Sequence, residues 1–188
     1  MRFYKVVTLP TRPDYAKCLH KKTSFMPLTI FPLLAGFFLL VAPLSLLHAQ
    51  ALPSNYSMIV NKWIKSDNLR TKPKGASYAI VDLDTATIYI GDVDSDGDDD
   101  IVADYGVTYG GNAITQFLTV FLNNKGKLSK GYKKEVGMTG VVMVDSIVIE
   151  NGEIICTTLV WQGDDSQCCP SGEGFVKYVF RKGKIKRL

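Results

Sequence analysis

Residues 140–161 read GVVMVDSIVIENGEIICTTLVW, and this stretch decides the fold. Gly140 to Ile149 and Glu153 to Trp161 are two runs rich in β-branched residues, which favour strands. Asn151-Gly152 lies between them, and both residues readily adopt the positive φ that a two-residue hairpin turn requires. The stretch therefore predicts an antiparallel β-hairpin.

Strand patterns continue on both sides of this hairpin. Further turns are predicted at Asn123 to Lys127 and at Lys182-Gly183, and Gly106 to Asn112 is expected to be a glycine-containing connection. The other expected strands are Ser77 to Leu83, Thr87 to Ile90, Ile101 to Tyr105, Ile114 to Leu122, Phe175 to Phe180 and Lys184 to Leu188.

One short helix is expected before the first strand, over Ser54 to Lys65. Ser54 is its expected N-cap, and its apolar stripe would consist of Met58, Ile59, Trp63 and Ile64. Leu69 to Gly75 reads as a polar loop. The predicted fold class is therefore mainly β, a short N-terminal helix followed by an antiparallel sheet or sandwich of about seven or eight strands.

The first 51 residues have the pattern of a secretory signal peptide. Basic residues precede an apolar run without charges from Phe25 to Leu47, and the small-x-small triplet Ala49-Gln50-Ala51 follows. We expect cleavage after Ala51 and a single exported β-domain over residues 52–188. The alternative is a retained anchor, because about 20 apolar residues can span a bilayer. Interior prolines, which break helices, weigh against it; they are Pro27, Pro32 and Pro43.

The charge of the chain changes once this leader is set aside. Six of the 22 Lys and Arg residues and one of the 18 Asp and Glu residues precede Leu52, so the formal charge falls from +4 to −1. No nucleic-acid partner is therefore expected.

Both histidines, His20 and His48, also lie in the leader. Their loss excludes Ser-His-Asp and Cys-His catalysis and histidine metal sites from the exported domain.

An acidic loop is the strongest chemical signal. Residues 92–101 read DVDSDGDDDI, with aspartates at alternate positions and a glycine at the sixth. Ca²⁺ takes six to eight oxygen ligands at flexible geometry, and such spacing points several carboxylates into one concavity. The predicted ligands are Asp92, Asp94, Asp96, Asp98 and Asp100, with Asp98 contributing its backbone carbonyl. The alternative is an acidic turn that folds without metal.

This loop resembles the calcium loop of the FG-GAP/VCBS repeats. The resemblance covers about Ile88 to Tyr105 and implies Ca²⁺ bound between two strands. An EF-hand would need a glutamate at loop position twelve, where Ala103 stands. A full propeller is excluded because it needs several blades and the motif occurs here once.

Three cysteines follow the leader, and an oxidising compartment predicts a disulfide among them. Cys156 could bridge to Cys168 or Cys169, closing a loop of about a dozen residues and stabilising the fold by about 3 kcal/mol. The competing arrangement is a vicinal Cys168–Cys169 bridge, which leaves Cys156 as a buried thiol.

The order of these features resembles a family of small exported bacterial proteins without an assigned activity. The matching segments are Asp92 to Asp100, Phe117 to Gly126, Val144 to Ile154, Cys168 to Ser171 and Tyr178 to Phe180. The Cys-Cys-Pro-Ser motif after the Asn-Gly hairpin carries most of the likeness. The resemblance implies an exported β-fold and no particular chemistry.

We therefore expect a non-enzymatic, periplasmic or secreted monomer that binds one structural Ca²⁺ and has no stable membrane span after cleavage. Its partner would be a protein or glycan at the cell envelope.

Lysines gather between Lys125 and Lys134 and from Lys177 to the C-terminus. These bases are either solvated hairpin edges or a patch for an anionic partner. The second hypothesis is thus a glycan binder or enzyme inhibitor using the basic C-terminal hairpin. The third is a hydrolase using Asp164, Asp165 or Glu173.

Overall fold

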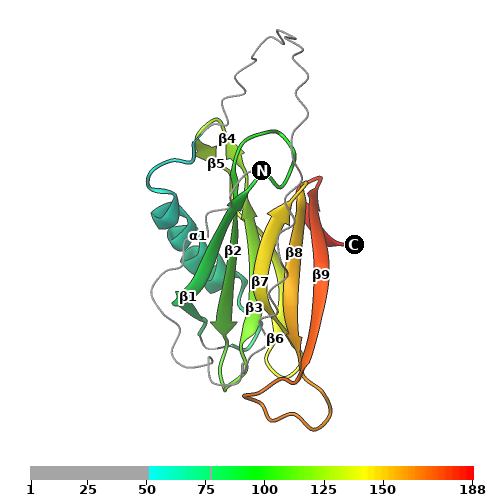
Figure 1. The fold of residues 1–188 in the computed structure, drawn as a ribbon. Helices are drawn as coiled ribbons and strands as arrows, with labels where there is room; N and C mark the ends of the chain where they lie inside the picture. The colour runs from blue at the N-terminus through cyan, green and yellow to red at the C-terminus, as the bar shows by residue number, and fades with distance from the viewer. Residues whose placement is uncertain (1–50, 77) are drawn as a thin grey trace, which may run out of the picture.

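The computed structural model describes residues 51–76 and 78–188 (Figure 1). One helix precedes ten strands, and an eight-stranded antiparallel sheet dominates the fold. The elements are α1 (Tyr56–Thr71), β1 (Ile80–Gly91), β2 (Asp100–Thr108), β3 (Thr115–Phe121), β4 (Asn123–Asn124), β5 (Lys127–Leu128), β6 (Tyr132–Met138), β7 (Val142–Glu150), β8 (Glu153–Val160), β9 (Gly172–Arg181) and β10 (Lys184–Arg187). The predicted mainly β class, with one short helix and about eight strands, is confirmed.

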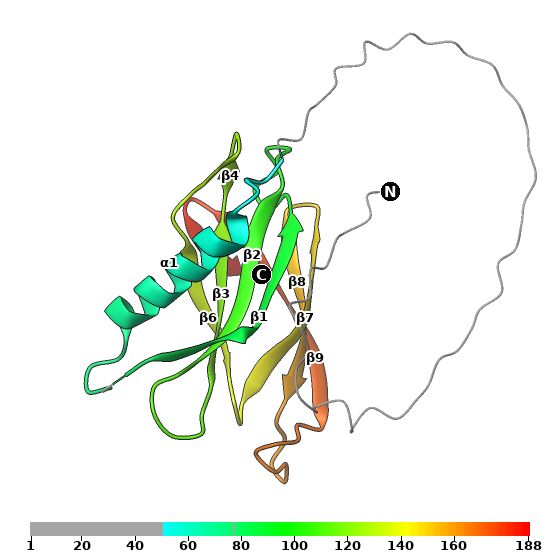
Figure 2. The same cartoon turned by 90° about the vertical axis from the view of Figure 1, so that its left-hand side faces the viewer.

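The large sheet is a meander with the order β1-β2-β3-β6-β7-β8-β9-β10, while β4 and β5 form a separate small hairpin. Its described strands do not close into a barrel. The meander has one narrow point, because β6 and β7 pair through Met138 and Val142 alone. There the sheet folds over, so that β7, β8 and β9 lie against the inner face of β1, β2, β3 and β6 (Figure 2).

Two apolar cores hold three layers together. Val60 and Ile64 of α1 pack on one face of β2 and β3, against Ile101, Tyr105 and Phe121 among others. The opposite faces of these strands meet the second half of the sheet. That inner core includes Val102, Leu118, Val120, Val144, Ile147, Ile149, Ile154, Cys156, Val176, Tyr178, Phe180 and Ile185. Strand β2 is consequently buried on both faces along most of its length.

A side-chain amide bridges the layers near the fold-over point. Gln116 of β3 donates to the backbone oxygen of Val144 (2.9 Å) and to Asp104 Oδ1 (2.8 Å). Its own oxygen accepts the backbone N–H of Val144 (2.5 Å). This buried amide thus satisfies both backbone groups of one β7 residue, where the ladder between β6 and β7 is nearly absent.

The hairpin turns agree with the sequence prediction. Asn151 and Gly152 have φ of 52° and 74°, and Lys182 and Gly183 have φ of 52° and 71°. These paired left-handed conformations are those that two-residue hairpins need.

The helix is longer than predicted and begins differently. It runs to Thr71, so Leu69 to Thr71 are helical rather than part of a loop, and Asn55 rather than Ser54 is the N-cap residue. Pro73 explains the end, since the residue before a proline is disfavoured in α conformation. Met58, which was expected in the apolar stripe, is solvent-exposed. Val60, which was not expected there, is buried in its place.

The strands also differ in places. The two strands predicted over Ser77 to Leu83 and Thr87 to Ile90 are one strand, β1, with a register shift between Asp82 and Thr87. Ser77 itself lies outside the described residues. Strand β2 extends to Thr108, three residues into the predicted connection, because Gly106 and Val107 continue the ladders to both neighbours. Strand β6 was not predicted, since its lysines obscure its alternation.

Residues 1–50 lie outside the described residues, and they include all of the expected signal peptide except Ala51. Within the described part of the chain, no helix has both the length and the apolar character needed to cross a membrane.

Candidate metal centre

The acidic loop connects β1 to β2 and is anchored at its base. Gly91 and Asp100 are the last ladder partners of the two strands. Val93, the one apolar residue among the aspartates, is buried in the inner core. Because the Val93 side chain packs in this core, it holds the loop against the sheet.

The loop's backbone is wrapped around the Asp92 carboxylate. Its Oδ1 accepts the N–H groups of Ser95 (2.7 Å) and Asp96 (3.2 Å), and its Oδ2 accepts that of Gly97 (3.0 Å). Ser95 and Gly97 have φ of 67° and 94°, in the left-handed region. Glycine at position 97 therefore permits the sharp turn that the sequence predicted there.

Asp100 closes the loop from the other side and is fully buried. One of its oxygens accepts the backbone N–H of Val93 (3.0 Å), and the other accepts that of Asn123 (2.8 Å). Asp100 thereby fixes both the loop and the start of β4, 23 residues further along the chain.

Three carboxylates converge in this loop. One oxygen each of Asp92, Asp94 and Asp100 lies within 4.8 Å of the other two. Asp92 is half-buried and Asp94 is exposed, so the group opens from the core toward solvent. Of the five predicted ligands, Asp96 and Asp98 are not part of this group. Asp96 instead accepts the N–H of Asp98 (2.9 Å) within the loop.

The electrostatics of the loop disfavour its negative charges. Burial raises the pKa of Asp100 to about 7 against the effect of its two backbone hydrogen bonds, and the charges of Asp94 and Asp96 raise it further. Burial, together with the charges of Asp96 and Asp92, also raises the pKa of Asp94. A divalent cation placed among these oxygens would offset the repulsion.

Two residues contribute to the centre without having been predicted. Val93 had a visible signal, as a single apolar residue in an acidic run. Asn123 had none, because its contact with Asp100 is made by a backbone N–H, which every residue except proline carries, and the two residues are 23 positions apart in the sequence.

The carboxylates proposed for hydrolysis lie in and beside the loop between β8 and β9. Asp165 accepts the N–H groups of Gln162 (2.7 Å) and Ser171 (2.8 Å), and these hydrogen bonds lower its pKa. Asp164 and Glu173 are exposed. Asp165 therefore closes a loop, which accounts for this carboxylate without catalysis.

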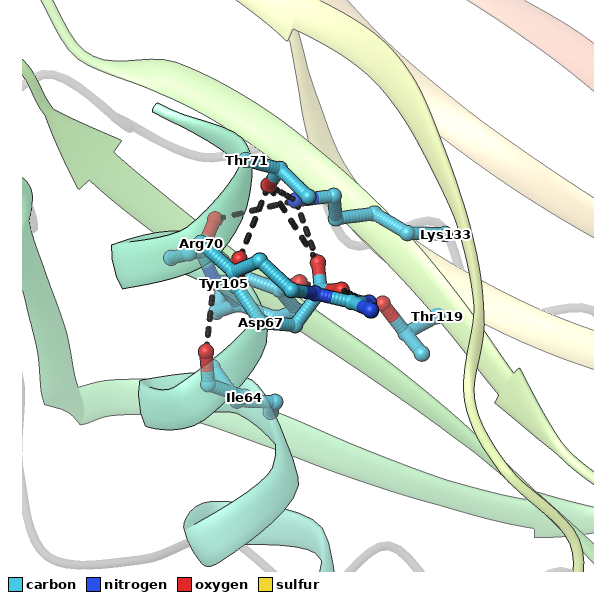
Figure 3. Close-up of polar contacts among 8 residues, drawn as sticks. Ile64, Asp67, Arg70, Thr71, Tyr105, Thr119 and Lys133 are labelled. Carbon is cyan, nitrogen blue, oxygen red and sulfur yellow. Dashed lines mark hydrogen bonds and ion pairs between the residues drawn. The ribbon is translucent and has the colours of Figure 1, made fainter.

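A second polar cluster lies between α1 and the sheet (Figure 3). Lys133 of β6 contacts Asp67 Oδ2 (2.6 Å), Thr71 Oγ1 (2.6 Å) and Asn68 Oδ1 (3.2 Å). Arg70 also pairs with Asp67 (2.8 Å). Tyr105 and Thr119 share a hydrogen bond beneath them (3.1 Å). This cluster fastens the last turns of α1 to the sheet.

Comparison with known proteins gives no relatives: no protein-family model, curated protein or solved structure matches the chain. The resemblances drawn from the sequence motifs therefore stay predictions, and function has to be argued from the loop and the surface.

Proposed function

We propose that this protein is an exported, non-enzymatic β-domain that binds one Ca²⁺ in its acidic loop for structural stability. The observation that carries the proposal is the convergence of Asp92, Asp94 and Asp100 at the mouth of the β1–β2 hairpin. Carboxylates of this kind are hard oxygen donors, as Ca²⁺ prefers, and backbone carbonyls and water would supply the remaining ligands.

A structural role follows from the backbone segments to which the ligand residues are hydrogen-bonded. Asp100 holds the backbone of Val93 and Asn123, so a cation at this point would join the β1–β2 loop to β4. A ligand that binds only the folded state stabilises it by about 2.7 kcal/mol at one hundred times its Kd.

The test compares thermal unfolding of the full chain in Ca²⁺ and in chelator, with isothermal titration for affinity. Asp94→Asn removes an exposed carboxylate from the group. We expect Ca²⁺ to raise the melting temperature of the parent protein and to bind the variant about tenfold more weakly or worse.

Asp84→Asn is the matched control, because it removes the same charge from an exposed position in β1 outside the loop. It should bind Ca²⁺ as the parent does. The proposal fails if Ca²⁺ gives neither heat nor a melting shift, or if both variants behave alike.

A second candidate function is binding of an anionic envelope partner, such as an acidic glycan, through the basic C-terminal hairpin. One observation favours it: the β9–β10 hairpin adjoins the other lysine-rich segment. Phe180 packs on Tyr132 of β6 with ring centroids 4.9 Å apart, and the Nζ of Lys130 lies 5.9 Å from the same tyrosine ring. Tyr132 thus places Lys130 beside the β9–β10 hairpin, whose own bases are exposed: Arg181, Lys182, Lys184, Lys186 and Arg187. Lys125 and Lys127, in the segment before Lys130, are exposed as well.

Retention on an acidic polysaccharide column tests this candidate. Replacing Lys182 and Lys184 by alanine should lower the salt concentration needed for elution, since fewer charges contact the polymer. Replacing Lys62 and Lys65, which are exposed on α1, removes equal charge elsewhere and should leave elution unchanged. Absence of retention at low salt, or equal shifts in both pairs, counts against a specific basic surface.

A further inference from the structure

The loop between β8 and β9 presents two adjacent cysteines at the surface. Cys168 and Cys169 are both exposed, and their Sγ atoms lie 2.6 Å apart. The backbone of this loop already holds the two sulfurs side by side.

Hydrogen bonds that do not involve the sulfurs determine the shape of this loop. The Asp165 carboxylate joins its two ends, through the N–H groups of Gln162 and Ser171. The indole N–H of Trp161 donates to the backbone oxygen of Ser166 (3.1 Å). A change in the chemical state of the cysteines can therefore occur without loss of the loop.

The surroundings of Cys168 favour its thiolate form. Its hydrogen bonds with Cys169 and with the Ser166 hydroxyl, 3.1 Å away, lower the pKa of Cys168. The thiolate is the attacking species in thiol–disulfide exchange, and exposure gives an oxidant access to it.

Cys156 is separated from this pair. It is fully buried in β8, between Ile147 of β7 and Val176 of β9 in the ladder, and burial raises the pKa of its thiol to about 12. The strand ends at Val160, four positions beyond Cys156, which is about 13 Å at the rise of a β-strand. A bridge from Cys156 to the loop would require the core to open.

We propose that Cys168 and Cys169 form a reversible redox site that exchanges with low-molecular-weight disulfides. This site does not depend on the Ca²⁺ proposal. Adjacent residues have Cα atoms about 3.8 Å apart, which is shorter than the usual span of a disulfide, so their bridge is strained. Strained and exposed disulfides are the more easily reduced ones, which makes the oxidation reversible.

The exchange balances in two steps. The Cys168 thiolate attacks one sulfur of the small disulfide, a mixed disulfide forms, and one small thiolate leaves. The Cys169 thiolate then attacks Cys168 Sγ, the vicinal disulfide forms, and the second small thiolate leaves. The two protons lost by the cysteines are taken up by the two leaving thiolates, so one disulfide is reduced as one is formed.

The experiment equilibrates the full chain, carrying Cys18→Ser, in a series of oxidised and reduced glutathione ratios, followed by acid quenching and mass spectrometry. All three remaining cysteines fall on one tryptic peptide, because no Lys or Arg lies between Lys134 and Lys177. Additional digestion with chymotrypsin cuts at Trp161 and separates Cys156 from the pair.

We expect a loss of two hydrogens confined to the peptide with Cys168 and Cys169, restored by excess reduced glutathione. Cys156→Ser should give the same midpoint ratio. Cys169→Ser should stop at a glutathione adduct on Cys168, because no second thiol can displace it. A disulfide that includes Cys156, or a pair that stays as thiols or adducts at every ratio, would overturn the proposal.

Discussion

Lys133 shows how one residue can fasten a helix to a sheet. Its side chain, 16% exposed, reaches from β6 to Asp67, which is 6% exposed. Burial raises the pKa of Asp67, but the hydrogen bonds and charges of Lys133 and Arg70 outweigh it, so the pKa of this carboxyl lies below its usual range. The buried carboxylate is thus stable in its charged form only because its partners surround it.

Replacing this carboxylate by an amide tests the cluster. Asp67→Asn should destabilise the protein by about 2 kcal/mol at pH 7, because Lys133 keeps its burial and loses its counter-charge. Since the folded pKa is lowered, the carboxylate stabilises the protein above its unfolded pKa, and this contribution is lost as pH falls through the folded pKa. The penalty of the variant should therefore shrink in acid.

Urea unfolding at several pH values measures this penalty. Asp164→Asn removes an aspartate charge from an exposed loop and should cost little at any pH. A penalty for Asp67→Asn that stays constant from neutral to acid pH would show that the charge of Asp67 does not stabilise the fold.

At this scale the sequence predicted the candidate site in part. Aspartates at alternate positions before and after a glycine are a local pattern, so Asp92, Asp94 and Asp100 were found from spacing alone. Which of the aspartates converge depends on tertiary contacts. These are the burial of Val93 in the core and the hydrogen bond from the backbone N–H of Asn123 to Asp100. Spacing also predicted a side-chain ligand at Asp96, which is not among the three converging carboxylates, and a backbone-carbonyl ligand at Asp98, which this carboxylate group does not test.

Among the elements, β6 and β7 approach each other closely at Gly137. A Cβ on Gly137 would collide with the backbone oxygen of Val142 and lie 3.2 Å from the Cα of Met143. These are backbone atoms and cannot move aside cheaply. The absence of a side chain at position 137 is thus what lets the sheet fold over here.

Gly137→Ala should destabilise the protein by about 1–3 kcal/mol, the usual cost of forcing extra volume into a packed site. Gly163→Ala is the matched control, because a Cβ at position 163 would meet no atom within 4 Å. Denaturant midpoints of the two variants, with unchanged slopes, report the difference. Equal midpoints would contradict a tight junction at Gly137.

Elements defined by their own turns were predictable, and elements defined by distant partners were not. The Asn151-Gly152 and Lys182-Gly183 hairpins follow from local backbone preferences. The last six residues of α1 lie beyond the predicted helix end at Lys65. They include the polar Asp67 and Asn68, which are buried where Lys133 of β6 contacts them. Strand β6 was missed for the same reason. Its Lys133 is placed inside the fold by contacts with Asp67, Asn68 and Thr71 of α1, which are distant in the sequence.

Over the whole molecule, the fold class was predictable but the layering was not. Regular turns and β-branched runs indicate an antiparallel sheet of this size. Where that sheet folds over depends on Gln116 and Val144, which are 28 residues apart and joined by a side-chain amide. No periodicity in the sequence marks such a bridge, because a glutamine inside a strand ordinarily reads as a solvent-facing residue.

The order of the strands also has a kinetic consequence. Each pairing in the main sheet joins strands that follow one another in the meander, so most of the loops that must close are short. Closing short loops costs little chain entropy, and folds rich in such contacts have low contact order. No strand has to be inserted between two others that are already paired, so the nascent sheet can grow outward from any of its hairpins.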